Sequence, residues 1–354
     1  MTEASEVGVT VEELGLATRN HGMPLEALRY DVTPLGLHYL LTHYDIPAID
    51  TDGWRLRVDG GAGEPLELSL ADLRAMPAVT RRVTMECAGN GRALLDPRPV
   101  SQPWLLEAVG TSDWTGVAVA DLLAQVDVAD GAVEIVFSGA DRGIEHGVEQ
   151  HYQRSLPLDV ATGPDAMLAY AVNGVALPPQ HGYPLRLIVT GWYGMTNVKW
   201  LASMTAVTVP FTGYQQESSY RLRQREDEAG APLTRMLPRA LMLPPGIPDF
   251  LTRARQVRAG AHQLSGRAWS GRAPVTSVAV SADGGNTWFD AEVEPPTRHA
   301  VWQAWRSEWR AGRGSHELCC RATDAAGTTQ PIAPPWNVGG YANNAVQRIT
   351  VHVT

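Results

Sequence analysis

The stretch "TMECAGNGR", residues 84–92, places a cysteine at the point where a strand meets a turn. Side chains alternate between the two faces of a strand, so Val83, Met85 and Cys87 are expected to share one face. A cysteine in this position is either a small buried hydrophobe or a reactive thiol, and the residues that follow it bear on that choice.

The turn that follows Cys87 is built for unusual backbone conformations. Gly89 and Gly91 provide conformational freedom, and Asn90 tolerates positive φ. Open backbone N–H groups and the cation Arg92 favour the thiolate form of Cys87. Such a thiolate suits a nucleophile or a soft-metal ligand. The residues themselves leave three alternatives open: nucleophile, metal ligand and packed hydrophobe.

Length and composition describe an ordinary globular protein. The 354 residues suggest two or three domains, and the formal net charge of -9 argues against nucleic acid or an anionic membrane as the main partner. No apolar run reaches membrane-spanning length. The first residues show no secretory or twin-arginine segment, so a cytoplasmic location is expected, or a periplasmic one if a leader has been trimmed.

The other two cysteines, Cys319 and Cys320, lie in a predicted strand. We expect one of them to pack in the core and the other to face a neighbour. Three cysteines, two of them adjacent, make a disulfide framework improbable. The absence of CxxC and HxxxH pairs argues against a zinc site.

The first part of the chain, to about residue 205, mixes strand-like and helix-like segments. Strands are predicted at 54–60, at 132–143 with a polar turn at its end, and at 184–194; helices are predicted at 69–76, capped by Ser69, and at 116–128. This order predicts an α+β domain that does not repeat a βαβ unit.

The second part has a different character. A Pro-rich and charged stretch at 223–250 is interpreted as a linker or a segment that wraps the surface. After it come alternating strands, with a hairpin centred on the "DGGN" that begins at Asp283. This pattern predicts a β-sandwich of roughly 100 residues. Trp302, Trp305 and Trp309 are expected in its core or at an interface.

A second group of polar residues surrounds one predicted buried strand. His181, Arg186 and Lys199 bracket this strand, and on an acidic protein they suggest an anion site that would fit a phosphate. The alternative is a set of solvated loop charges. His43, in a loop bounded by proline, reads by itself as an ordinary histidine. No P-loop, GxGxxG or GxSxG motif supports nucleotide, flavin or serine-hydrolase chemistry.

Together these motifs resemble the sulfite oxidase family of molybdenum enzymes. The stretch around Cys87 is similar to the family's cysteine motif. Further similarity covers "TPLGLHYLLTHYDIPAID" (33–50), "LAYAVNGVALPPQHGYPLRLIVTGWYGMTNVKWL" (168–201), "GRAWSGRAPVTSVAVSADGGNTW" (266–288) and "WNVGGYANNAVQRITVHV" (336–353). The resemblance runs in order from about Thr33 to the end of the chain.

The resemblance implies an architecture and a cofactor. The expected parts are an N-terminal extension (1–32), an α+β molybdopterin-binding domain with its linker (33–250), and an immunoglobulin-like dimerisation domain (251–354). Cys87 would be the protein ligand of molybdenum. The implied cofactor-binding residues are Cys87, His43, Asp141, His181, Arg186 and Lys199, and the implied substrate-pocket residues are Arg92, Trp104 and Tyr220.

The implied activity is oxygen-atom transfer at a small sulfur compound, as in sulfite oxidases. No HPGG or CxxCH stretch indicates a haem domain, so an external acceptor such as a cytochrome is expected. A homodimer is expected. The alternatives are a sulfane-sulfur dehydrogenase, a sulfoxide reductase, an enzyme with a cysteine nucleophile, and a non-catalytic assembly module built on the sandwich.

Two departures from the family pattern concern the substrate. Leu41 and Gly339 stand where animal sulfite oxidases are expected to carry arginines. Fewer cations would hold a doubly charged oxyanion less well. Arg19 and His21 are the candidates to supply charge instead.

Overall fold

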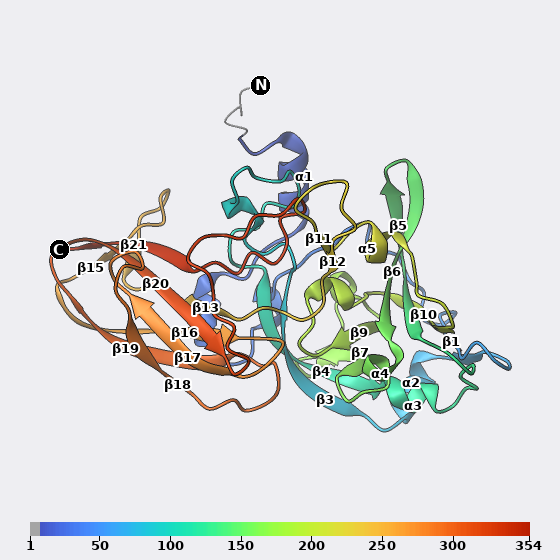
Figure 1. The fold of residues 1–354 in the computed structure, drawn as a ribbon. Helices are drawn as coiled ribbons and strands as arrows, with labels where there is room; N and C mark the ends of the chain where they lie inside the picture. The colour runs from blue at the N-terminus through green and yellow to red at the C-terminus, as the bar shows by residue number, and fades with distance from the viewer. Residues whose placement is uncertain (1–7) are drawn as a thin grey trace.

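A computed structural model describes residues 8–354 and shows two parts side by side, a mixed α/β part and an all-β part (Figure 1). Strands β1 to β10 form the first part, and β13 to β21 form the second. The predicted fold class, α+β followed by a β-sandwich, is confirmed. No helix within residues 8–354 has the length and apolar character needed to cross a bilayer.

The first part contains two sheets that share one hydrophobic core. One sheet has the order β2 (Leu66–Leu68), β1 (Leu56–Asp59), β10 (Leu201–Val207), β5 (Glu134–Glu145), β6 (Val148–Pro157). In the other, β3 (Val79–Glu86), β4 (Val109–Ala118), β7 (Ala166–Val172) and β8 (Val175–Ala176) follow one another, and β9 (Arg186–Val189) pairs with β7. Fully buried Leu56 and Phe137 of the first sheet and Leu168 and Leu187 of the second lie in the same cluster.

Short helices accompany these strands: α1 (Val11–Arg19), α2 (Leu70–Ala75), α3 (Val119–Leu123), α4 (Leu158–Ala161) and α5 (Tyr214–Glu217). The predicted cap of α2 is present. Ser69 Oγ accepts from the Asp72 backbone N–H at 3.1 Å, and the Asp72 carboxylate accepts from the Ser69 N–H at 2.8 Å. This reciprocal pair satisfies N–H groups that an uncapped helix leaves open.

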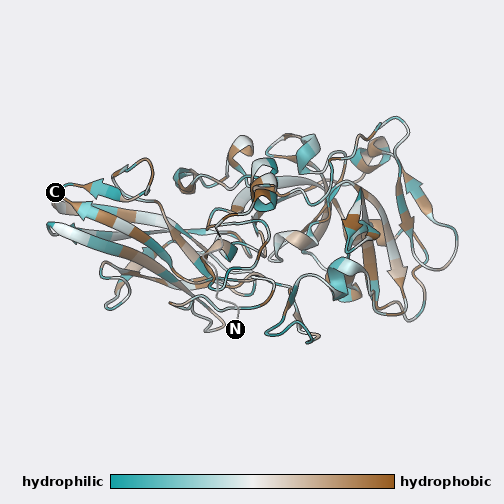
Figure 2. Cartoon of the chain, turned by 90° about the horizontal axis from the view of Figure 1, so that it is seen from above, coloured by the Kyte–Doolittle hydropathy of each residue, from teal (hydrophilic) through white to brown (hydrophobic). Residues whose placement is uncertain are grey.

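The second part is a nine-stranded sheet that folds into two layers. Its order is β13 (Arg239–Met242), β16 (Gly260–Trp269), β19 (Gln303–Ala311), β18 (Phe289–Val293), β17 (Val275–Ser281), β20 (Gly314–Asp324), β21 (Gln347–Val353), β15 (Arg255–Val257), β14 (Ile247–Pro248). Strand β18 pairs with β17 on one side and β19 on the other, which joins the layers. Hydrophobic and hydrophilic bands alternate along these strands (Figure 2).

The alternation predicted for the sandwich strands is confirmed. Leu318, Cys320 and Ala322 of β20 point into the core, and Cys319 faces Arg348 at 4.0 Å on the other side. All three cysteines are free. Trp305 and Trp309 lie in this core, and Trp302 lies in the cluster between the two parts.

Three expectations about local structure are wrong. The helix predicted at 116–128 is only α3, because residues 116–118 complete β4. A Cβ at Gly116 would lie 1.8 Å from the Leu168 carbonyl oxygen, so the close approach of β7 requires glycine there. The polar turn expected at the end of the stretch 132–143 comes later, since β5 continues to Glu145 and its register only shifts between Ser138 and Arg142.

The stretch at 223–250 is not a linker throughout. It contains β12 (Ala231–Pro232), which pairs with β11 (Arg221–Leu222), and β13, which pairs with β16 of the sandwich. All four residues of β13 are buried. Proline and charge suggested an irregular segment, but tertiary pairing decides otherwise.

Candidate active site

Strand β3 places Cys87 at its end, directly before the turn. Val83, Met85 and Cys87 lie on the same buried face, as the alternation predicted. The Cys87 N–H donates to the Ala108 carbonyl at 2.9 Å, which fixes the start of the turn. Gly91 has φ of 89°, a conformation that favours glycine.

Burial and nearby donors act on the Cys87 thiol in opposite directions. The residue is 6% exposed, and burial raises the pKa of the thiol. The Gly89 N–H, the Arg92 guanidinium and the Trp104 indole lower this pKa. The Trp104 N–H has no other hydrogen-bond partner among the described residues. A thiol surrounded by donors is one whose deprotonated form these neighbours would stabilise once a cation binds it.

A cavity opens on Cys87 and collects most of the predicted site residues. Its open space is about 600 Å³, solvent at its mouth included. Seven residues predicted from the sequence line it: His43, Cys87, Asp141, His181, Arg186, Lys199 and Tyr220. Arg92 and Trp104 are not lining residues and lie beside the thiol instead.

Arg186 and Lys199 bring buried positive charge to this cavity. Arg186, at the start of β9, donates to the carbonyls of His181 at 2.9 Å and Asn197 at 3.2 Å, and its Nε has no partner among the described residues. Lys199 Nζ donates to the carbonyls of Leu41 and Gln180. Burial is the main cause that lowers the pKa of Arg186 to about 10 and of Lys199 to about 7.

Asp141 and His181 are buried, and within residues 8–354 neither side chain forms a hydrogen bond with another residue, although the His181 ring packs edge-on against the His38 ring at 5.7 Å. Asp141 is 5% exposed, and its Oδ1 accepts no hydrogen bond. Burial raises the pKa of Asp141 to about 7, and Lys199 opposes this shift. Burial and the nearby positive groups lower the pKa of His181 to about 2, so this imidazole is neutral at pH 7.

His43 and Tyr220 come from distant segments and meet at the cavity. His43 Nε2 and the Tyr220 hydroxyl form a short hydrogen bond, and the His43 ring lies 4.8 Å from the Tyr152 ring. Tyr220 has φ of 51°, which is unusual for a residue with a side chain. Burial lowers the pKa of His43 to about 3 and raises that of Tyr220 well above its usual value.

Sequence reasoning missed several residues that line the cavity. His38, Tyr39, Tyr152 and Asn197 belong to this group. His38 is 2% exposed, its Nε2 has no partner among the described residues, and burial lowers its pKa to about 4. His38 lies in the same stretch, 33–50, as His43, and this proximity is the feature of the sequence that could have identified it. Nothing in the sequence pointed to Tyr152.

Leu41 and Gly339, the two positions that depart from the family pattern, differ in where they lie relative to the cavity. Leu41 lines the cavity. Gly339 does not line it, but its carbonyl accepts from Arg92 Nε at 3.0 Å. Arg19 does not line the cavity either and donates to the Tyr44 carbonyl at 2.7 Å. His21 also lies outside it, and after the larger effect of burial its electrostatic interaction contributes to lowering the pKa of His38 and His181.

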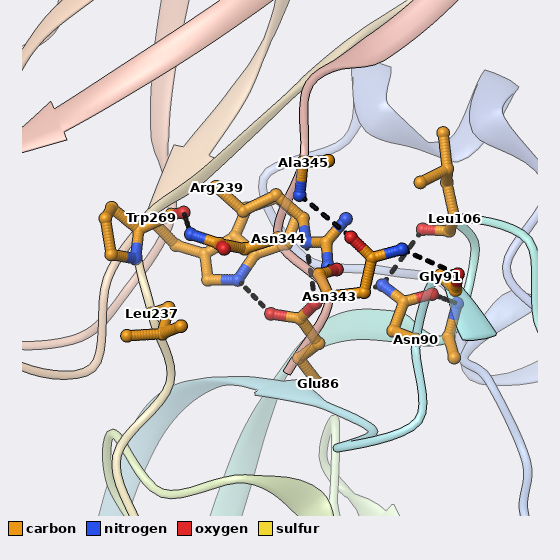
Figure 3. A network of polar contacts seen from close by, with 12 residues as sticks. Glu86, Asn90, Gly91, Leu106, Leu237, Arg239, Trp269, Asn343, Asn344 and Ala345 are labelled. Carbon is orange, nitrogen blue, oxygen red and sulfur yellow. Dashed lines mark hydrogen bonds and ion pairs between the residues drawn. The ribbon is translucent and has the colours of Figure 1, made fainter. Parts of the chain in front are cut away.

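A buried polar network holds the Cys87 turn against the sandwich (Figure 3). Glu86 pairs with Arg239 Nε at 2.7 Å and accepts from Trp269 Nε1 at 2.9 Å and Asn90 Nδ2 at 3.0 Å. Asn343 Nδ2 donates to the Gly91 carbonyl at 2.7 Å. The residues on both sides of Cys87 are thus fixed by partners from β13, β16 and the loop before β21.

The donor set of the cavity fits a molybdenum–pterin group. Unpartnered buried polar atoms on His38, Asp141 and Arg186 point to a polar ligand, because buried polar groups normally find partners. The described residues contain no group of three or more His, Cys, Asp or Glu that could form a complete metal site. A single soft thiolate therefore suits a metal whose other ligands come with an organic cofactor.

Comparison with known proteins agrees with this reading. Residues 43–215 match the oxidoreductase molybdopterin binding domain, and residues 248–354 match the Mo-co oxidoreductase dimerisation domain. Sulfite oxidase of Gallus gallus is 33% identical over 344 residues, which cover 90% of this chain and 72% of that protein. Mitochondrial sulfite oxidase of Homo sapiens is also 33% identical, and the match spans 91% of this chain but only 62% of that protein.

A solved structure shares the whole fold. The sulfane dehydrogenase SoxCD from Paracoccus pantotrophus aligns with a TM-score of 0.81 at 24% identity, over 100% of this chain and 95% of that one. The order of motifs, the cavity around Cys87 and these similarities lead to one conclusion. The chain belongs to the sulfite oxidase family of molybdopterin-dependent oxidoreductases.

Proposed function

We propose that the cavity holds a molybdenum–pterin cofactor through Cys87, and that the protein catalyses oxygen-atom transfer at a small sulfur compound. The observation that carries this proposal is a single buried thiol at the wall of a cavity lined by buried, partly unpartnered polar groups. When bound, the cofactor supplies two-electron oxygen-atom transfer.

The residues of the cavity divide the work by their chemistry. Cys87 binds the metal as a thiolate. Lys199 and Arg186 hold the anionic end of the cofactor, because buried cations are strong partners for phosphate. Neutral His43 and His181 and the carboxyl group of Asp141 hydrogen-bond to the polar edges of the pterin.

The substrate end of the cavity is formed by Tyr220, with Arg92 and Trp104 beside the thiol. Tyr220 orients the substrate through its hydroxyl, which His43 holds in place. Arg92 contributes positive charge that favours an anion, and the Trp104 indole lies beside the thiol. Sulfite is the proposed substrate, in line with the names of the relatives.

Electrons leave for a separate acceptor such as a cytochrome in this proposal. The protein forms a homodimer through residues 251–354, and the match of residues 248–354 to a dimerisation domain supports this. Sedimentation of the purified protein measures the dimer directly.

The decisive experiment replaces the proposed metal ligand. Cys87→Ser is expected to lower molybdenum content and to abolish sulfite oxidation with an artificial electron acceptor, because a hydroxyl is a much poorer ligand for a soft site. Cys319→Ser is the matched control, since that cysteine is free and far along the chain in β20. Active wild-type protein that lacks molybdenum would contradict the proposal.

Two other activities are separated by further measurements. An enzyme with a nucleophilic Cys87 would be alkylated by iodoacetamide at neutral pH, whereas a metal-bound thiolate is protected. Steady-state assays with sulfite, thiosulfate and a sulfoxide distinguish a sulfite oxidase from a sulfane dehydrogenase or a sulfoxide reductase. The sulfane alternative is kept because Leu41 gives one wall of the cavity an apolar side chain.

A further inference from the structure

Four side chains from separate parts of the chain form one stack behind the cavity. The Arg154 guanidinium lies over the Tyr220 ring at 5.9 Å, the Tyr220 and Tyr341 rings are 5.2 Å apart, and the Arg92 guanidinium lies over the Tyr341 ring at 5.0 Å. Two arginines therefore enclose two tyrosines. Cation–π contacts of this kind gain strength when they are desolvated.

Arg154 is an unusual member of this stack because it is a buried charge without a counterion. It is 2% exposed, it donates to the Gln215 carbonyl, and its Nε has no partner among the described residues. It forms no ion pair within residues 8–354; the nearby Glu217 carboxylate pairs with Arg221 and is 47% exposed. An uncompensated buried charge is costly, so a functional anion close by explains its retention.

Tyr341 joins the two halves of the stack and explains Gly339. A Cβ at Gly339 would lie 2.3 Å from the Tyr341 ring, so a side chain at 339 and the present position of the ring exclude each other. The Tyr341 hydroxyl also lies 3.2 Å from the Oγ of Ser219, the residue directly before Tyr220 in the chain. The loop before β21 thus fixes Arg92 and Tyr220 in one arrangement.

We propose that Arg154 and Tyr341 are positioning residues that hold Tyr220 and Arg92 at the substrate end of the cavity, and that the paired charges of Arg154 and Arg92 select a small oxyanion there. The inference rests on the proposed function only in taking the Tyr220 end of the cavity as the substrate end. Arg154 does not line the cavity itself and would act on the oxyanion through the Tyr220 ring that separates them.

Sulfate tests the charge, because it is an oxyanion that this chemistry does not turn over. Titration calorimetry of the purified holoprotein is expected to give a sulfate Kd about tenfold weaker for Arg154→Gln, since one buried charge is removed near the ligand. Arg142→Gln is the matched control: it removes one positive charge from the neighbouring strand β5, where the side chain is 68% exposed. This control is expected to bind sulfate like wild type.

Arg154→Lys separates the effect of the positive charge from the effect of side-chain packing. It also provides the test if Arg154→Gln fails to fold. This variant keeps the charge and is expected to bind sulfate within about threefold of wild type. The proposal is overturned if wild type does not bind sulfate, if Arg154→Gln binds as tightly as Arg142→Gln, or if Arg154→Lys loses binding as completely as Arg154→Gln. Sulfate binding stays measurable if the protein does not oxidise sulfite, so the two proposals fail separately.

Steady-state kinetics test the positioning role of Tyr341. Tyr341→Ala is expected to lower kcat for sulfite, with molybdenum content unchanged, because Tyr220 and Arg92 lose their shared support. Arg154→Gln is expected to act mainly on KM. A loss of molybdenum content in Tyr341→Ala that matches its loss of kcat would indicate a merely structural role and would overturn the assignment.

Discussion

At the scale of single residues, Gly339 shows how an absent side chain can be a structural requirement. Its neighbour Tyr341 occupies the space above it, and its carbonyl accepts from Arg92. From the resemblance to the family, position 339 was expected to carry an arginine, and the glycine there was interpreted as the loss of a positive charge. The structure shows that Tyr341 fills the volume a side chain there would need.

Gly339→Ala is therefore expected to raise KM for the oxyanion substrate and to weaken sulfate binding, because the added methyl group displaces the Tyr341 ring. Gly312→Ala is the control, since a Cβ there meets no atom within 4 Å. Kinetics and sulfate titration of both variants measure the effect. Equal behaviour of the two variants would show that the Tyr341 ring does not position the site.

The site residues also show which contacts sequence reasoning can reach. Cys87, His181, Arg186 and Lys199 lie in compact motifs, and the structure brings them to one cavity. Arg154 could not be found in this way, because its burial behind Tyr220 depends on the packing of β6 against a segment more than sixty residues away.

At the scale of secondary structure, the buried Glu13 carboxylate is one of the contacts that attach α1. Glu13 accepts from Arg98 and from the backbone N–H of Thr10 at 3.0 Å, and its side chain is buried. The hydrogen bond from Arg98 is the main cause that lowers the pKa of Glu13 from 4.5 to about 2. A carboxyl group whose pKa is lowered by folding stabilises the folded state above its unfolded pKa.

The attachment of α1 is thus expected to be complete above about pH 4.5 and to weaken as the pH falls towards 2. Hydrogen-exchange protection of the α1 amides, corrected for intrinsic rates, measures this. Glu13→Gln is expected to lose protection already at pH 7. Glu12→Gln, an exposed neighbour with the same change of charge, should keep it. Protection that is independent of pH would refute the role of Glu13.

The short elements were also the hardest to predict. The capping box of α2 follows from four residues of local sequence and is present. The ends of α3 and β5 depend on strands that approach from elsewhere, such as β7 against Gly116. Local propensity cannot anticipate such pairings, because the deciding contact lies outside the local window.

At the scale of the whole molecule, Glu86 and Arg239 join the two parts. Their side chains are 1% and 2% exposed, and Glu86 directly precedes Cys87 in the chain. Removing one partner of a buried ion pair leaves the charge of the other partner buried and uncompensated. The interface between the parts and the geometry of the site are therefore coupled.

Arg239→Met is expected to lower the free energy of unfolding by about 3–5 kcal/mol and to reduce molybdenum content. Chemical denaturation and metal analysis measure the two effects. Arg306→Met is the control, since its pair with Glu292 lies on the surface and is expected to matter little. Unchanged stability of Arg239→Met would show that the network does not couple the parts.

The sequence by itself determined the cysteine motif and the order of the α+β and sandwich parts, because these depend on local patterns, and its resemblance to the family pointed to seven residues that line the cavity. Only the tertiary structure decided that β13 belongs to the sandwich, that Tyr341 excludes a side chain at Gly339, and that Arg154 is buried behind Tyr220. The physical reason is that burial and stacking depend on contacts between segments far apart in the chain, which no local pattern encodes.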